Sequence, residues 1–172
     1  MKHKLLITLS TLAFTIVACE SKPKEPMETA SEKPAQPTEK VEKSDDAWKA
    51  ELTAEQYRVA RQAGTEAPNG KVYKQFKEQG AGTYYCVGCN AELFSSNEKF
   101  DSRCGWPSFY DPANAKNVKT EADYSGGMVR TEVKCAVCDA HLGHVFKGEG
   151  FDTPTDKRYC INGIVLKFVA DK

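Results

Sequence analysis

The stretch Arg158-Tyr-Cys-Ile-Asn-Gly-Ile-Val-Leu-Lys-Phe-Val169 is the most strand-like segment of this 172-residue chain. Its β-branched and aromatic residues favour a strand, and alternation places Arg158, Cys160 and Asn162 on one face. The same face continues in apolar residues (Ile164, Leu166 and Phe168). We therefore expect one strand that runs from a polar, cationic end into an apolar core.

Cys160 lies at the polar end of this expected strand. A cationic neighbour, Arg158, favours the thiolate form of a cysteine. The amide of Asn162 is suited to orient a substrate oxygen or a water. The alternative is a buried structural cysteine, a common fate of this residue type.

Three further segments have strand character: residues 82–86, 127–135 and 141–146, with Gly, Asn, Asp and Pro between them. One segment, residues 52–62, has the pattern of a helix. It begins with a capping box, in which Thr53 and Gln56 bond each other's backbone N–H, and Gly64 is placed to end it. The fold class is therefore mainly β and antiparallel, with a helix at the front.

Four of the seven cysteines form two C-x-x-C pairs, Cys86-Val-Gly-Cys89 and Cys135-Ala-Val-Cys138. Such pairs present two thiolates from one tight turn, and four thiolates make a closed tetrahedral zinc site with no open position for catalysis. Two disulfides, or one redox-active pair, are the alternatives. A metal here would hold two distant hairpins together.

The segment Arg103-Cys-Gly-Trp-Pro-Ser-Phe109 has the composition of a loop. A thiol on a loop, Cys104, can move to meet another thiol, and Trp106 is either a core residue or the wall of a pocket. Two histidines, His141 and His144, follow the second C-x-x-C pair. They are either functional groups or metal ligands, although four cysteines already complete a tetrahedral site.

Taken together, several motifs in this chain resemble those of type B methionine sulfoxide reductases. The motifs run in the family's order from Leu52 to Phe168: residues 52–57, 64–66, 84–89, 99–102, 105–109, 141–146 and 158–162. The resemblance implies two antiparallel sheets with short N-terminal helices and a structural zinc ion. It also implies the reduction of methionine (R)-sulfoxide in oxidised proteins or peptides, with no organic cofactor.

The resemblance also implies individual roles. Cys160 matches the nucleophile, which becomes a sulfenic acid. Cys104 matches the recycling cysteine, which forms a disulfide with Cys160 that a thioredoxin-like dithiol reduces. Trp106 matches the wall beside the substrate methyl group, and we place Arg158 beside it as a substrate-binding residue. The groups around the sulfoxide oxygen are His141, His144 and Asn162, and either histidine or a water supplies the proton.

One departure from the family pattern follows Asn162. The chain has Gly163-Ile164-Val165-Leu166, where many members have Ser and another small residue. The change concerns local packing more than the chemistry.

Two other functions compete with this interpretation. A general thiol–disulfide oxidoreductase would use a C-x-x-C pair as its active site, and bound zinc would exclude it. A non-catalytic zinc-knuckle binding module would need neither Cys104 nor Cys160.

The N-terminal region is not expected to belong to the fold. Residues 1–18 have a basic start and an apolar run too short to span a bilayer comfortably, as in an export signal. The run ends Ile16-Val-Ala-Cys19, which resembles a bacterial lipobox, so we expect Cys19 to be lipidated; an ordinary secretory signal is the alternative. Residues 19–46 are charged and proline-rich, as in a disordered tether, and residues 47–172 form the domain.

These features predict an exported protein, lipid-anchored to a bacterial membrane on its periplasmic or extracellular face. Lysine and arginine (24 together) balance aspartate and glutamate (24 together). No basic patch stands out, so nucleic acid is not an expected partner. We expect a monomer.

Overall fold

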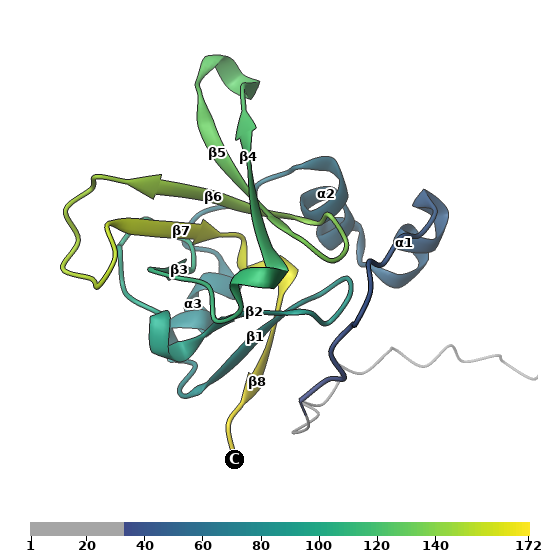
Figure 1. The fold of residues 1–172 in the computed structure, drawn as a ribbon, viewed down its shortest axis with the longest axis horizontal. Coiled ribbons are helices and arrows are strands. Elements are labelled where there is room, and N and C mark those ends of the chain that lie inside the picture. Colours follow the sequence, from purple (N-terminus) through teal and green to yellow (C-terminus); the bar gives the residue numbers. More distant parts are fainter. Residues whose placement is uncertain (1–32) are drawn as a thin grey trace, which may run out of the picture.

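The computed structural model describes residues 33–172 and contains two antiparallel sheets (Figure 1). The smaller sheet has the strand order β2-β1-β8, and the larger has the order β3-β7-β6-β5-β4. The strands are β1 (Gly82–Cys86), β2 (Glu92–Ser95), β3 (Ser108–Phe109), β4 (Val118–Asp123), β5 (Arg130–Cys135), β6 (His141–Lys147), β7 (Lys157–Ile161) and β8 (Leu166–Ala170). The expected fold class is confirmed.

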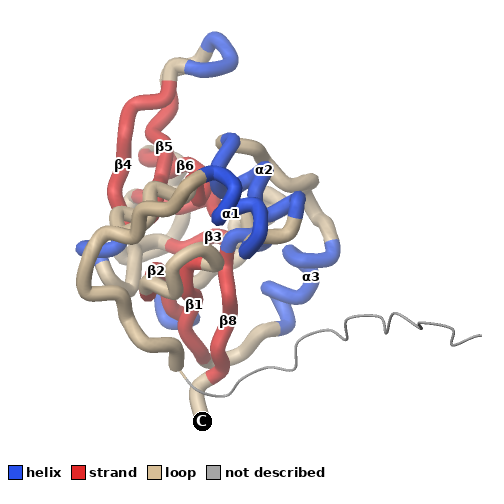
Figure 2. The backbone as a smooth tube through the Cα atoms, turned by 90° about the vertical axis from the view of Figure 1, so that its right-hand side faces the viewer, coloured by secondary structure: helices blue, strands red, loops and turns tan. Residues whose placement is uncertain are grey.

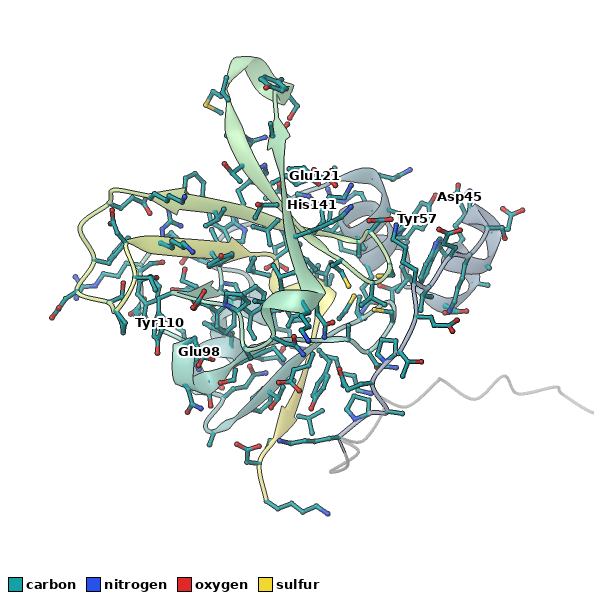
Figure 3. The ribbon with its side chains drawn as sticks, in the orientation of Figure 1. Asp45, Tyr57, Glu98, Tyr110, Glu121 and His141 are labelled. Carbon is teal, nitrogen blue, oxygen red and sulfur yellow. The ribbon has the colours of Figure 1, made fainter. Side chains whose placement is uncertain are left out.

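Three short helices precede the strands: α1 (Asp45–Glu51), α2 (Ala54–Gln62) and α3 (Lys71–Glu78). The predicted capping box at the start of α2 is present, since Gln56 N donates to Thr53 Oγ1 and Thr53 N donates to Gln56 Oε1. The left-handed residue at the end of α2 is Ala63 (φ 52°), one position before the expected glycine. The Tyr57 hydroxyl donates to Asp45 at 2.7 Å and joins α1 to α2 (Figure 3).

Aromatic side chains from both sheets and from α3 form the centre of the core. Phe94 of β2 stacks on Phe109 of β3 with ring centroids 4.5 Å apart, and Tyr84 of β1 meets Phe109 edge-on at 5.1 Å. Phe76 of α3 and Tyr159 of β7 close the cluster. Packing of these rings therefore joins the small sheet to the large one. It also holds β3 and β7, the strand that carries Cys160, in place.

The segment expected to be one long strand is two strands in different sheets. It breaks after Ile161, where residues 163–165 form a 3-10 helix, and then continues as β8 beside β1 (Figure 1). Val165 is fully buried in the core. The prediction of one continuous face from Arg158 to Phe168 is therefore wrong, because the turn at Asn162 redirects the chain from one sheet to the other. Gly163, Ile164 and Val165, where the chain departs from the family pattern, form this turn.

Residues 33–44 lie along both C-x-x-C turns and continue into α1, a course visible in Figure 2 as the loop that leads to that helix. The Val41 N–H donates to the Val137 carbonyl at 2.8 Å, and Gln36 bonds the backbone of Asn90 and Glu92. This course differs from the disordered tether expected through residue 46. The predicted signal, residues 1–18, and Cys19 lie outside the described residues. Among residues 33–172, no helix has the length and apolar character needed to cross a membrane.

Candidate active site

Cys160 lies near the end of β7, between strands β3 and β6. It is paired in register with Ser108 on one side and with His144 on the other. Gly143 allows this close packing, because a Cβ there would lie 2.1 Å from the Cys160 carbonyl oxygen. The strand pairing thus places a histidine directly opposite the predicted nucleophile.

The loop before β3 brings Cys104 to the same place. Its Sγ lies 3.7 Å from Cys160 Sγ, and neither sulfur is bonded to another cysteine. The loop turns through two residues with positive φ, Arg103 (58°) and Gly105 (93°). Ser102 donates to Cys104 Sγ at 3.0 Å. The two redox cysteines expected from the sequence are therefore neighbours in space.

The two thiols have opposite pKa shifts. A hydrogen bond from the Cys160 thiol, with further ones from Ser102 and Ser108, lowers the pKa of Cys104 to about 4, although burial opposes this. The adjacent Cys104 anion and burial raise the pKa of Cys160 well above its usual range, and Arg158 offsets only part of the effect. These shifts favour the negative charge on the Cys104 sulfur and the proton on Cys160.

A pocket of about 180 Å³ opens beside Cys160. Its wall includes the indole of Trp106, which is half-buried and so lies at the pocket rather than in the core. The pocket is lined by Thr65, Trp106, Arg130, Gly143, His144, Phe146, Cys160 and Asn162. It thus brings together four of the predicted site residues, while Cys104, His141 and Arg158 are not part of its lining.

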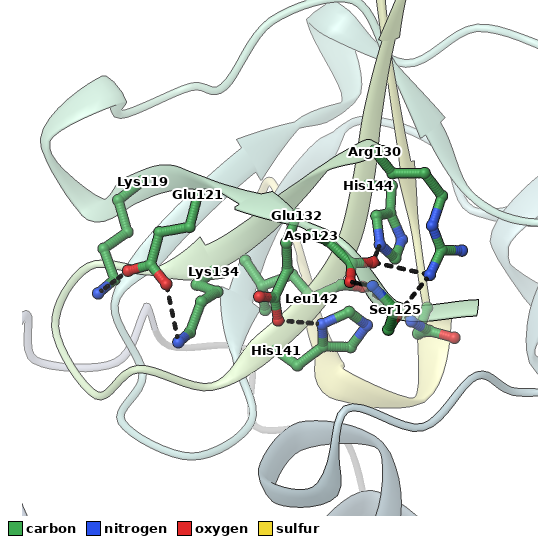
Figure 4. Close-up of polar contacts among 11 residues, drawn as sticks. Lys119, Glu121, Asp123, Ser125, Arg130, Glu132, Lys134, His141, Leu142 and His144 are labelled. Atoms are coloured by element: carbon green, nitrogen blue, oxygen red, sulfur yellow. Dashed lines mark hydrogen bonds and ion pairs between the residues drawn. The ribbon is translucent and has the colours of Figure 1, made fainter. Parts of the chain in front are cut away.

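Each predicted histidine is bonded to a carboxylate (Figure 4). His144 Nε2 lies 2.8 Å from Asp123 Oδ2, and His141 Nδ1 lies 2.6 Å from Glu132 Oε1. His141 is 4% exposed, and its Nε2 has no hydrogen-bond partner. Burial lowers the pKa of His141, against the opposing effect of Glu132. The His141 ring packs against the His144 ring with centroids 5.6 Å apart, and His144 is the histidine at the pocket.

Asp123 is held as an anion at the pocket's edge. Its carboxylate accepts from the Ser125 N–H (2.8 Å), His144 and Arg130 (2.7 Å), and these contacts hold the pKa of Asp123 well below its usual range. A bound carboxylate fixes the orientation of the histidine ring. With Nε2 engaged, Nδ1 is the atom of His144 left for proton exchange.

Asn162 and Trp106 are both bonded to Glu66. The Glu66 N–H donates to Asn162 Oδ1 at 2.9 Å, and Trp106 Nε1 donates to the Glu66 carbonyl at 3.0 Å. Asn162 Nδ2 also donates to the Leu142 carbonyl at 3.0 Å. The Asn162 amide is thus largely committed to the backbone, and one amide hydrogen and one lone pair of Oδ1 remain for a substrate.

The Glu66 carboxylate is itself buried, at 8% exposure. It accepts from the N–H groups of Gly163 (2.6 Å) and Ile164 (3.0 Å) at the start of the 3-10 helix. Burial raises the pKa of Glu66, although these two backbone donors oppose the shift. One residue therefore ties the aromatic wall, the amide and the turn after Cys160 into one unit.

The expectation that Arg158 binds substrate receives no support from its position. Its guanidinium forms a two-point ion pair with Glu149 (2.7 and 2.8 Å) and stacks 4.6 Å from the Phe146 ring. Arg158 still favours the Cys160 thiolate, as expected, although the Cys104 sulfur and burial outweigh its effect on the pKa of Cys160. Arg158 instead supports Phe146, which lines the pocket.

The four C-x-x-C thiols form one cluster, in which all ligand atoms lie within 4.8 Å of one another. The closest pairs cross between the turns: Cys86 to Cys138 and Cys89 to Cys135, each 3.6 Å. Sulfurs bound to one tetrahedral zinc at ~2.3 Å lie about 3.8 Å apart, so these residues fit the ion. The geometry does not match the Cys86–Cys89 and Cys135–Cys138 disulfides considered from the sequence.

Sequence reasoning missed the carboxylates of this site. In the sequence Glu132 has only the pattern of a strand residue, and nothing local marks Asp123 or Glu149. Glu66 lay inside a matched motif, Gly64-Thr-Glu66, but nothing in a single sequence indicates that its side chain is buried. Only their long-range partners give these residues a role.

The chain matches the SelR domain over residues 52–170. Curated proteins named peptide methionine sulfoxide reductase MsrB are similar to it. The protein from Leifsonia xyli is 54% identical over 129 residues (74% of this chain and 90% of the relative), and that from Herminiimonas arsenicoxydans is 53% identical over 133 residues (77% and 94%). The protein from Hahella chejuensis is 51% identical over 130 residues (76% and 91%). With its Cys160 pocket and four-cysteine cluster, this chain belongs to the SelR-domain family of type B peptide methionine sulfoxide reductases.

Proposed function

We propose that this enzyme reduces methionine (R)-sulfoxide in oxidised proteins, with Cys160 as the nucleophile. One observation carries the proposal: Cys160 lies in the pocket between Trp106 and His144, with a second thiol, Cys104, 3.7 Å away. The sulfoxide side chain enters this pocket, with its methyl group against Trp106 and its oxygen toward His144.

The reaction begins with a proton shift within the cysteine pair. The Cys104 thiolate takes the Cys160 proton as the substrate excludes water, and the Cys160 thiolate attacks the sulfoxide sulfur. His144, oriented by Asp123, supplies the proton that the sulfoxide oxygen acquires. The S–O oxygen passes to Cys160, methionine leaves, and Cys160 becomes a sulfenic acid, so that the substrate sulfur is reduced and the cysteine is oxidised.

Cys104 then resolves the sulfenic acid. Its sulfur attacks Cys160, water leaves, and a Cys104–Cys160 disulfide forms. A disulfide requires about 2.05 Å between the sulfurs, so the loop must carry Cys104 closer than its present 3.7 Å. An external thioredoxin-like dithiol restores both thiols by exchange.

The four-cysteine cluster has a structural role in this proposal. Zinc held by Cys86, Cys89, Cys135 and Cys138 links the turn after β1 to the turn after β5. A closed four-thiolate site leaves no position for substrate. Its contribution is to folding.

We further propose that the enzyme repairs proteins outside the cytoplasm. The basic and apolar start of the chain and the lipobox-like Cys19 support export and lipid anchoring to a bacterial membrane. Changing Cys19 to Ala should release the protein from the membrane fraction or block its processing. A variant that still cofractionates with membranes, together with a wild type that carries no lipid by mass spectrometry, would overturn this.

Separated R and S epimers with dithiothreitol as reductant test the reaction. The R epimer should be reduced and the S epimer left. Without reductant, Cys104→Ser should release about one methionine per enzyme, because Cys160 alone reduces the sulfoxide. A Cys160 sulfenic acid that can be trapped should remain. Single-turnover activity in Cys160→Ser would overturn the assignment.

A further inference from the structure

Within residues 33–172, the large apolar side chains that are exposed all lie on one short turn. They are Tyr124 (74% exposed), Met128 (58%) and Val129 (77%). The turn, residues 124–129, joins β4 to β5 and is called the hairpin tip below. The β4–β5 hairpin projects from the body of the molecule in both views (Figures 1 and 2). Exposed apolar groups that gather in one place, rather than scatter singly, mark interaction sites.

The hairpin tip begins at the edge of the active-site pocket. Asp123 and Arg130 face each other in register at its base, and Arg130 also donates to Ser125 within the tip (3.2 Å). Arg130 lines the pocket, and Asp123 holds the pocket's His144. The hydrogen bonds that orient the catalytic histidine therefore also fix where the tip starts.

Met128 is the apolar tip residue expected on the pocket side. Its backbone is extended (φ −123°, ψ 154°), and residues two apart in an extended chain share a face. Met128 therefore falls on the same side as Arg130. The tip residues themselves, Tyr-Ser-Gly-Gly-Met-Val, include no charged side chain.

The pocket has room for one side chain only. Its volume is about 180 Å³, below the roughly 300–1,000 Å³ of typical small-molecule sites. When the sulfoxide belongs to a polypeptide, the residues on either side of it must leave the pocket and lie on the surrounding surface. The hairpin tip is the apolar part of that surface.

We propose that the hairpin tip is a docking surface for the residues that flank methionine sulfoxide in an oxidised polypeptide, and that it favours apolar flanks. This rests on the proposed function, since the sulfoxide must first occupy the Cys160 pocket. The tip is uncharged and continuous with the pocket, so apolar neighbours of the sulfoxide are the partners it fits.

The test compares three substrates: N-acetyl-methionine (R)-sulfoxide, a peptide with Leu and Val on both sides of the sulfoxide, and a peptide with Ser and Gln there. The variant is Tyr124→Ser/Met128→Ser/Val129→Ser, and Thr120→Ser, an exposed β4 position outside the tip, is the matched control. The wild type and the control should prefer the apolar-flanked peptide. The triple variant should lose that preference, with kcat/KM for this peptide falling roughly tenfold, because partial burial of such side chains is worth that much.

The N-acetyl substrate separates docking from chemistry. Its kcat/KM should be unchanged in the triple variant, because it has no flanking residues. An equal fall for all three substrates, or no fall for the apolar-flanked peptide, would refute the docking surface while leaving the reductase function intact. If the wild type reduces none of the three, the proposed function fails instead.

The same triple variant also tests whether the tip instead binds a second copy of the chain or a lipid surface. A wild-type dimer that the triple variant abolishes, measured by sedimentation, with peptide kinetics unchanged, would assign the tip to a second copy. Loss of binding to phosphatidylglycerol vesicles, again without a change in peptide kinetics, would assign it to a lipid surface. Either result would overturn the proposal.

Discussion

Replacing the buried carboxylate of Glu66 tests whether one residue holds the substrate pocket together. Glu66→Gln keeps the side-chain volume but replaces one of its two acceptor oxygens with an NH₂ donor. One of the two bonds to the Gly163 and Ile164 N–H groups (2.6 and 3.0 Å) is then lost, and a donor faces a donor.

The cost follows from the burial of these groups. A buried donor left without a partner costs about 1–3 kcal/mol, and Glu66 is 8% exposed. Burying an amide is less costly than burying a carboxylate, which offsets part of this loss. We therefore expect the free energy of unfolding to fall by about 1–2 kcal/mol at neutral pH.

Activity should fall by more than stability alone explains. The Gly163–Ile164 turn follows Asn162 directly, and a misplacement of about 1 Å in a site can cost on the order of 100-fold in rate. The Glu66 backbone still bonds Trp106 and Asn162. Because these two bonds remain, we expect a smaller loss than 100-fold, roughly tenfold in kcat/KM for the R epimer.

The pH dependence of stability gives a second measure. Burial raises the pKa of Glu66 in the folded state above its ordinary value of 4.5. A raised carboxyl pKa contributes stability that is present below the unfolded pKa and is lost as the pH rises through the folded pKa. The Gln variant lacks this titration. The free energy of unfolding of the wild type minus that of the variant should therefore be largest at pH 4 and shrink toward pH 8. Between the unfolded and the folded pKa of Glu66, this difference should shrink by ~1.4 kcal/mol for every pH unit.

Urea unfolding at several pH values measures the free energy of unfolding, and steady-state kinetics of the same samples measure kcat/KM. Glu78→Gln, an exposed carboxylate at the end of α3, is the control and should stay within about 0.5 kcal/mol of wild type. If Glu66→Gln unfolds at the wild-type midpoint and turns over normally, the carboxylate does not organise the pocket.

Three further outcomes are expected. Because the Cys104 anion raises the pKa of Cys160, Cys104→Ser should lower it, and the rate of Cys160 alkylation by iodoacetamide should begin to rise at a lower pH than in wild type; an unchanged pH profile would exclude this coupling. Asp123→Asn should reduce kcat for the R epimer roughly 10–100-fold, since His144 loses its orienting carboxylate, and its pH–rate profile should move; a change in KM alone would contradict the role given to His144. Elemental analysis should find about one zinc per chain, and Cys89→Ser should lower both the zinc content and the unfolding temperature; a metal-free wild type with two disulfides would refute the cluster.

The sequence alone was sufficient wherever the signal was local. The capping box at Thr53 and Gln56 lies within four residues of chain, and it is present as predicted. The strand-like composition of residues 82–86 and 141–146, bounded by turn residues, located β1 and β6 well, because composition is a property of neighbouring residues. Paired C-x-x-C spacing indicated the metal cluster for the same reason, and the linear motifs identified the family.

Tertiary structure decided what depends on distant partners. Alternation after Arg158 could not separate one long strand from two strands in different sheets, because apolar residues occur on both sides of the turn at Asn162. The guanidinium of Arg158 is paired with Glu149, and His144 and His141 are each oriented by a carboxylate from another strand. Glu66 meets Gly163 across almost 100 residues of chain (separation 97). Such contacts form only when the sheets pack, so local periodicity carries no record of them, whereas they set the pKa values and orientations on which the chemistry depends.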